Sequence, residues 1–284
     1  MGAEAMIAFD FEYYAPLSIE ESITIYHKAQ KQKKKVMYYG GGTEFITFAK
    51  SNKMVADVVI DVKKIPECTV FELVEGELHI GAALTLTELA ESNLFPLLAK
   101  TVKGIADHTS RNKITIGGNL NSQLIYREGI LPFLLLDAKM LVASSEGKEV
   151  LPVQHIAEKG LPNDQLLVHL QVQQTDLQSP FKVIKRTRFS KVGYPVVTVA
   201  AIVKNQVIRF AISGVCSYPF RSTAMEDVLN DRDKAIEDRL VAVCKLLPEP
   251  IVHDLHASSA YREFVLKNIL KDVIESLEGH IKND

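Results

Sequence analysis

Short blocks of apolar residues alternate between helical spacing and β-type runs along the chain of 284 residues. Ser18 and Glu21 have the spacing of a capping box, which predicts a helix from there to about residue 33. Runs rich in β-branched and aromatic residues predict strands, and apolar residues at helical spacing predict further helices. Strands are expected at residues 36–39, 58–62, 69–74, 77–80, from 140, and at 166–172, 195–203 and 207–213; helices are expected at 45–50, 86–91, 96–103, 240–247 and 258–274.

These elements predict an α+β protein with small mixed sheets and without an internal repeat. The polar segment QVQQTDLQSP, which ends in Pro180, predicts a domain boundary near residues 172–180. The first domain is therefore expected to cover residues 1–174 and the second residues 175–284.

Two glycine-rich segments interrupt the apolar pattern. In YYGGGTEFIT, three glycines lie between a predicted strand and a predicted helix, where backbone N–H groups can point into one concavity and bind an anion. The second segment, TIGGN at residues 115–119, also presents small residues, backbone N–H groups and short polar side chains. Together the two segments can hold the phosphates of one dinucleotide, whereas a tight turn without a ligand is the alternative for the first segment alone. Neither has the spacing of a Rossmann fingerprint or a P-loop.

Composition and charge narrow the classes of function. The net charge is −2 at pH 7, which argues against nucleic-acid binding, and the basic run at residues 28–35 fits a solvated helix end. No apolar stretch is long enough to span a membrane and no secretion signal is recognisable, so a cytoplasmic location is expected. Cys68, Cys216 and Cys244 are widely scattered and are expected to be reduced core residues.

Few other polar residues have a spacing typical of chemistry. No Ser-His-Asp or Cys-His arrangement indicates a nucleophile, and the histidines have no spacing that indicates a metal site. His79 alternates with apolar strand residues and is expected to be structural. His108 precedes the second glycine segment, where it either approaches a cofactor or is a satisfied surface or core histidine. Asp57 and Asp61 bracket a buried strand and are expected to cap its ends.

The glycine segments and their surroundings resemble a known family. YYGGGTEFITFAK, followed further along by TIGGNLNSQLIYREGILPFLLLDAKMLV, is similar to the FAD-binding medium subunit of the xanthine dehydrogenase and carbon monoxide dehydrogenase family of molybdenum hydroxylases. The resemblance covers nearly the whole chain. It implies a two-part FAD-binding domain of PCMH type in residues 1–174, divided near residues 55–60, and a C-terminal sheet-and-helix domain that covers the flavin. The residues that match the two pyrophosphate loops are Gly40, Gly41, Gly42, Thr43 and Glu44, and Thr115, Ile116, Gly117, Gly118 and Asn119.

The resemblance assigns further cofactor contacts by position. Glu128 stands where the family has an Asp that reaches the ribityl chain or the flavin; its alternative role is that of a solvated partner of Arg127. Leu166 and Lys185 match residues near the flavin ring. Tyr194 matches an aromatic or acidic residue beside the isoalloxazine, although an aromatic residue at the start of a strand needs no such role.

The resemblance also implies a function and partners. In the implied complex a molybdopterin-binding large subunit hydroxylates the substrate, and a small subunit with two [2Fe–2S] clusters relays the electrons. The FAD of this chain then passes the electrons to NAD⁺ or another acceptor. Two other classes stay open: a stand-alone flavin oxidoreductase, and a relative of the fold that has lost the cofactor and has an interaction role.

Overall fold

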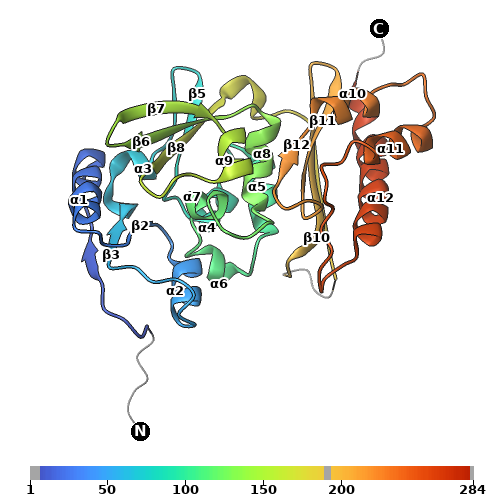
Figure 1. The fold of residues 1–284 in the computed structure, drawn as a ribbon. Helices are drawn as coiled ribbons and strands as arrows, with labels where there is room; N and C mark the ends of the chain where they lie inside the picture. The colour runs from blue at the N-terminus through green and yellow to red at the C-terminus, as the bar shows by residue number, and fades with distance from the viewer. Residues whose placement is uncertain (1–6, 189–192, 282–284) are drawn as a thin grey trace.

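The computed structural model describes residues 7–188 and 193–281, which form three small sheets arranged in a row (Figure 1). The first sheet is parallel, with the strand order β1-β3-β2. Its strands are β1 (Glu12–Tyr14), β2 (Val36–Tyr39) and β3 (Val58–Asp61). The helix α1 (Ile19–Lys31) packs against β2 and β3, and α2 (Thr43–Ala49) follows β2 directly. The first glycine segment therefore lies at the carboxyl end of a parallel strand.

The central sheet has five antiparallel strands in the order β4-β5-β8-β6-β7. One face contributes Leu78, Ile80 and Met140 to the largest core, beneath a group of short helices. The other face, with Val168, packs against α1 and the segment around Cys68. The strands are β4 (Phe71–Val74), β5 (Glu77–Gly81), β6 (Lys139–Ser144), β7 (Gly147–Pro152) and β8 (Leu166–Gln173); the helices are α3 (Pro66–Thr69), α4 (Leu86–Glu91), α5 (Pro96–Lys103), α6 (His108–Arg111), α7 (Ile116–Leu120), α8 (Leu131–Leu135) and α9 (Gln154–Lys159), with 3₁₀ turns at Val62–Lys64, Glu128–Ile130 and Gln174–Asp176.

The third sheet is antiparallel, with the order β12-β11-β10-β9. The inner strand β10 is buried on both faces. Val197 and Val199 belong to the C-terminal core, whereas Ala200 and Ile202 belong to the central core. This explains the continuous apolar run in that part of the sequence. The strands are β9 (Phe181–Thr187), β10 (Pro195–Lys204), β11 (Val207–Ser213) and β12 (Phe220–Arg221); the helices are α10 (Thr223–Leu229), α11 (Ile236–Cys244) and α12 (Ser259–Leu277), followed by a 3₁₀ turn at Glu278–His280.

The predicted α+β class with small sheets is confirmed, although each sheet is either parallel or antiparallel rather than mixed. The predicted segment boundary near residues 172–180 lies between β8 and β9. The division into domains 1–174 and 175–284 stays a prediction. No helix in residues 7–188 or 193–281 is both long and apolar enough to cross a membrane.

His169 on β8 gives the fold an expected sensitivity to acid. Its ring stacks on His79 with centroids 4.7 Å apart, and Gln171 Nε2 lies 3.2 Å from its Nε2. Burial, and secondarily the neighbouring His79, lower the pKa of His169 to about 4 from its ordinary value of 6.5. The imidazole is therefore neutral in the folded state at a pH where the unfolded chain already binds a proton.

The free energy of unfolding should therefore fall as the pH drops from 6.5 to about 4, by about 3 kcal/mol from this group. Urea unfolding of the wild type and of His169→Gln at several pH values measures the contribution. The variant should lose less stability than the wild type over this window. His27→Gln, which alters an exposed histidine of α1, is the control and should keep the wild-type slope. Equal slopes for the wild type and His169→Gln would contradict the assignment.

Candidate functional site

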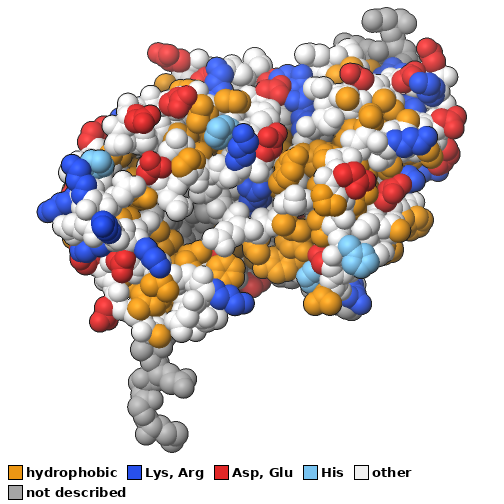
Figure 2. Space-filling view, in the orientation of Figure 1, with side chains coloured by type: hydrophobic (Ala, Val, Ile, Leu, Met, Phe, Trp, Pro, Cys, Tyr) orange, Lys and Arg blue, Asp and Glu red, His pale blue; other side chains and the backbone are white. Residues whose placement is uncertain are grey.

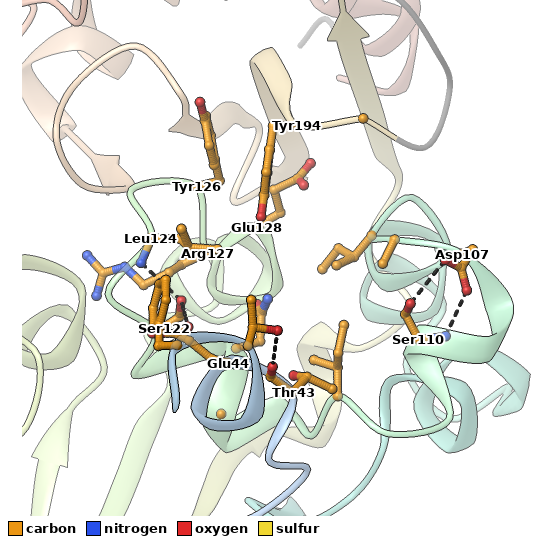
Figure 3. Close-up of a pocket in the computed structure, with 18 of the residues that line it drawn as sticks. Thr43, Glu44, Asp107, Ser110, Ser122, Leu124, Tyr126, Arg127, Glu128 and Tyr194 are labelled. Carbon is orange, nitrogen blue, oxygen red and sulfur yellow. Dashed lines mark hydrogen bonds between the residues drawn. The ribbon is translucent and has the colours of Figure 1, made fainter. Parts of the chain in front are cut away.

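Two adjoining hollows lie beside the first sheet and the short helices, and the larger one, shown in Figure 3, also reaches Lys185 of the C-terminal sheet. The larger has a volume of about 440 Å³ and the smaller about 260 Å³. Thr43, Glu44, Gly118 and Ser122 line both, so the hollows meet between the two glycine segments. Figure 2 shows a depression in the same part of the molecular surface. The two hollows together form an elongated cleft, and the two glycine segments lie near its middle.

The first glycine segment offers free backbone donors to this cleft. Gly42 has a φ of +70° and is the N-terminal capping residue of α2. Among the described residues, the N–H groups of Gly41 to Glu44 donate to no other protein group. Adjacent free N–H groups of this kind form a site for an anion. The carboxylate of Glu44 turns away from them, since it accepts hydrogen bonds from Ser122 Oγ and from the N–H of Gln123.

The second segment differs from the expectation. Residues 115–119 begin α7 rather than an open loop, with Thr115 as the capping residue. The N–H groups of residues 116–119 are already used: that of Gly117 donates to the carbonyl of Ala82 at 2.8 Å, and that of Gly118 to Thr115 Oγ1 at 3.2 Å. The N–H groups of Ile116 and Asn119 donate to backbone carbonyls at 2.9 Å. The prediction of free donors is therefore wrong for residues 116–119, which contribute shape rather than hydrogen bonds.

The glycines of the two segments serve different purposes. A Cβ on Gly41 would lie 1.7 Å from the carbonyl oxygen of Lys113, and one on Gly117 would lie 2.7 Å from the Cβ of Ala82. These glycines let the backbone segments touch. A Cβ on Gly118 meets only Thr115 Oγ1, at 3.0 Å, and Gly118 lines both hollows. A side chain at Gly118 would therefore project into the cleft, with a tight contact to Thr115 Oγ1.

Glu128 lies at the base of the larger hollow, in a setting that neither sequence interpretation described. It is 6% exposed and accepts hydrogen bonds from Lys185 Nζ at 2.9 Å and from Thr198 Oγ1 at 2.7 Å. Burial raises the pKa of Glu128, an effect that Lys185 and Thr198 oppose. The alternative role as a solvated partner of Arg127 is wrong. Arg127 is itself buried and donates to the carbonyls of Leu120, Ile156 and Ala157.

The other predicted site residues fall at both ends of the cleft. Tyr194 is about half exposed, lines the larger hollow and stacks on Tyr126, with ring centroids 4.9 Å apart (Figure 3). Lys185 lines the same hollow, whereas Leu166 lines the smaller one. His108 begins α6 and lines neither, which favours the structural reading.

Sequence reasoning missed several lining residues. Asp107, Ser110, Ser122 and Tyr126 line the larger hollow, although the sequence analysis assigned a role to none of them. Asp107 caps α6 by accepting from the N–H of Ser110 at 2.8 Å, and that spacing was the one available signal. Their place at the cleft follows from chain segments that meet only in the folded protein.

A cleft with free backbone donors near its middle, a small-residue wall and an aromatic pair at one end defines a dinucleotide-binding protein outside the Rossmann class. The chain belongs to the family described as FAD binding domain in molybdopterin dehydrogenase, which matches residues 9–172. The predicted family and the predicted cofactor, FAD, are both confirmed. The protein is a flavoprotein component of an oxidoreductase.

Similar proteins extend the likeness over the whole chain. The nicotinate dehydrogenase FAD-subunit of Eubacterium barkeri is 24% identical, over 95% of this chain and 98% of the relative. Carbon monoxide dehydrogenase from Hydrogenophaga pseudoflava superposes with a TM-score of 0.84 and 21% identity, over 97% of this chain and 100% of the other. Quinoline 2-oxidoreductase from Pseudomonas putida 86 gives a TM-score of 0.83 and 21% identity, over 96% and 99%. These two structures show the shared fold.

The residues present fit FAD. The free N–H groups at Gly41 to Glu44 suit a diphosphate, and Gly118 lines the same hollow without a side chain that would fill it. The two hollows lie on either side of that point, as the two ends of a dinucleotide require. Tyr194 at one end offers an aromatic face, and Lys185 offers a cation.

Proposed function

We propose that this chain is the electron-transferring FAD subunit of a multi-subunit molybdenum hydroxylase of the xanthine dehydrogenase type, acting in the cytoplasm. Electrons reach it from [2Fe–2S] clusters on a small partner subunit, after a molybdopterin-binding large subunit has oxidised the substrate. They leave to NAD⁺ or to another acceptor. The observation that carries the proposal is the pair of hollows that meet at Thr43, Glu44, Gly118 and Ser122.

The proposed cofactor site divides into three parts. The N–H groups of residues 41–44 bind the diphosphate, and the second glycine segment at residues 115–119 lets it approach closely. The isoalloxazine lies in the larger hollow, near Tyr194 and Lys185, and the adenosine end lies in the smaller hollow. This placement puts Leu166 near the adenosine end and not near the flavin ring, where the resemblance had assigned it. Glu128 acts behind Lys185 rather than on the ribityl chain.

The protein's own contribution is positioning. FAD supplies the redox chemistry once bound. Free N–H groups hold the diphosphate without a counter-charged side chain, and the stacked Tyr126 and Tyr194 limit water at the end of the larger hollow. Tyr194 is about half exposed, so this end of the hollow is the proposed side for electron exchange with a second reactant.

Purification from the native host tests this function. The tagged chain should co-purify with two other chains, with molybdenum and iron, and with about one FAD per copy. Anaerobic addition of a hydroxylation substrate should bleach the flavin of this complex, and NAD⁺ should restore its colour. Metal analysis, flavin quantitation and absorbance spectra give the readouts.

The two alternative classes give different results. A chain that elutes alone, carries FAD and oxidises NADH without a metal is a stand-alone oxidoreductase. A colourless chain that takes up no added FAD is a relative of the fold without its cofactor. A colour restored only by oxygen or by an artificial dye keeps the subunit assignment and excludes NAD⁺ as the acceptor.

A further inference from the structure

The contacts of Glu128 join three parts of the chain beneath the larger hollow. Glu128 belongs to the 3₁₀ turn before α8, Lys185 to β9 and Thr198 to β10. Lys185 Nζ also donates to the carbonyl of Gly104, at 2.8 Å. We call the side chains of Glu128, Lys185 and Thr198, together with the carbonyl of Gly104, the Glu128 cluster. It connects the C-terminal sheet to the helical part of the central core through the carboxylate of Glu128 and the carbonyl of Gly104.

Lys185 and Glu128 differ in how far their side chains are exposed to the hollow. Lys185 is 14% exposed at its side chain and Glu128 is 7% exposed, and both line the hollow. An ammonium group has three N–H donors, of which two have partners among the described residues. The remaining donor is therefore available to a group bound in the hollow. Both carboxylate oxygens of Glu128 are occupied.

The other charged groups around this hollow are engaged elsewhere. The guanidinium of Arg127 donates to three backbone carbonyls, and Asp107 accepts from Ser110. The carboxylate of Glu44 is bound by Ser122 and Gln123. Among the described lining residues, Lys185 is thus the cation whose charge is paired with a carboxylate, that of Glu128, whereas the guanidinium of Arg127 is held by backbone carbonyls and keeps an Nε without a partner.

We propose that Lys185 and Glu128 set the reduction potential of the bound FAD with opposite signs. The inference rests on the proposed placement of the isoalloxazine in the larger hollow. Reduction adds electron density to the ring, which a nearby cation stabilises and a nearby carboxylate opposes. Lys185 raises the potential directly, and Glu128 is a positioning residue that holds Lys185 and moderates its charge.

Potentiometric titration of the flavin in the purified, FAD-loaded protein tests this inference. Lys185→Met should lower the midpoint potential and Glu128→Gln should raise it. Each shift should be about 30 mV or more, a tenfold change in the relative affinity for reduced and oxidised FAD for a two-electron couple. Thr198→Val, which removes a contact of Glu128 without changing a charge, should leave the potential close to that of the wild type. Lys185→Arg should retain most of the wild-type value.

Thermal unfolding separates electrostatics from structure. Every single variant of the cluster is expected to lower the melting temperature. If the role of these residues were structural alone, the midpoint potential would not fall in Lys185→Met and rise in Glu128→Gln. If a single charge change prevents folding, the double variant Lys185→Met/Glu128→Gln restores neutrality. The midpoint potential of the double variant should then lie between the lower potential expected for Lys185→Met and the higher potential expected for Glu128→Gln. Shifts of the same sign, or unchanged potentials with a lower melting temperature, overturn the inference. A wild-type protein that binds no FAD overturns the cofactor site itself.

Discussion

Gly118→Val should raise the dissociation constant for FAD about 100-fold or more, a loss of about 3 kcal/mol of binding free energy, and leave folding largely intact. Gly118 lines both hollows where they meet, and its missing Cβ faces Thr115 Oγ1 at 3.0 Å and little else. The valine side chain would therefore occupy the space proposed for the diphosphate. Because Gly118 lies in α7, its replacement also removes a residue with poor helix propensity, which offsets part of any strain.

Flavin content after purification and fluorescence titration of the apoprotein with FAD measure this effect, and thermal unfolding measures the fold. Gly279→Val is a matched control, since a Cβ there meets nothing within 4 Å and the residue lies on an exposed 3₁₀ turn away from the cleft. Gly41→Ala is the opposite control. Its Cβ would clash with the backbone of Lys113, so it should unfold the protein as well as remove FAD. A Gly118→Val protein with full flavin content would show that the diphosphate lies elsewhere.

The glycine segments show how far sequence alone reaches. Three consecutive glycines after an apolar strand have few physical explanations, and the prediction of free N–H groups there agrees with Gly41 to Glu44. The TIGGN segment was harder, because two glycines disfavour a helix in isolation. Tertiary partners decide the outcome: the carbonyls of Ala82 and Leu84 accept the N–H groups of Gly117 and Ile116. Those partners lie in a loop whose proximity no local pattern indicates.

Charges show the other limit. Glu128 follows Arg127 in sequence, and the pair reads as two exposed neighbours. In the fold, Arg127 binds carbonyls 29 and 30 residues away, while Glu128 meets Lys185 and Thr198 at separations of 57 and 70 residues. Burial makes such contacts obligatory, because an unpaired buried charge is costly. Hydrophobic patterning predicts which segments are buried, but it does not predict which charged residue will be buried with them.

Arg262→Met should be among the most destabilising single changes in the chain, with a loss of about 3–5 kcal/mol of unfolding free energy. Arg262 on α12 is fully buried and is the largest such side chain among the described residues. Its Nη1 donates to the carbonyls of Val196 and Gly214, each at 2.7 Å, and its Nη2 donates to Asp254 at 2.6 Å. Methionine fills much of the volume but leaves these acceptors without their charged donor.

The position of Arg262 also connects this stability to the cofactor site. Val196 follows Tyr194 by two residues, and Gly214 follows the strand whose Ser213 hydroxyl donates to the carbonyl of Tyr126. The guanidinium thus fixes the backbone behind the stacked tyrosines. A variant that folds at low temperature should consequently bind FAD more weakly than the wild type, and Arg262→Lys should be intermediate, because one ammonium group cannot reproduce the geometry of a planar guanidinium.

Urea unfolding with and without FAD measures both effects, and Arg186→Met provides the control. Arg186 pairs with Asp272 at 3.3 Å on the surface, where both side chains are about half exposed, so its loss should cost less than about 1 kcal/mol. The two variants remove the same guanidinium and one ion pair each, and they differ mainly in burial. If Arg262→Met lost no more stability than Arg186→Met, the buried guanidinium would not be what joins α12 to the ends of β10 and β11.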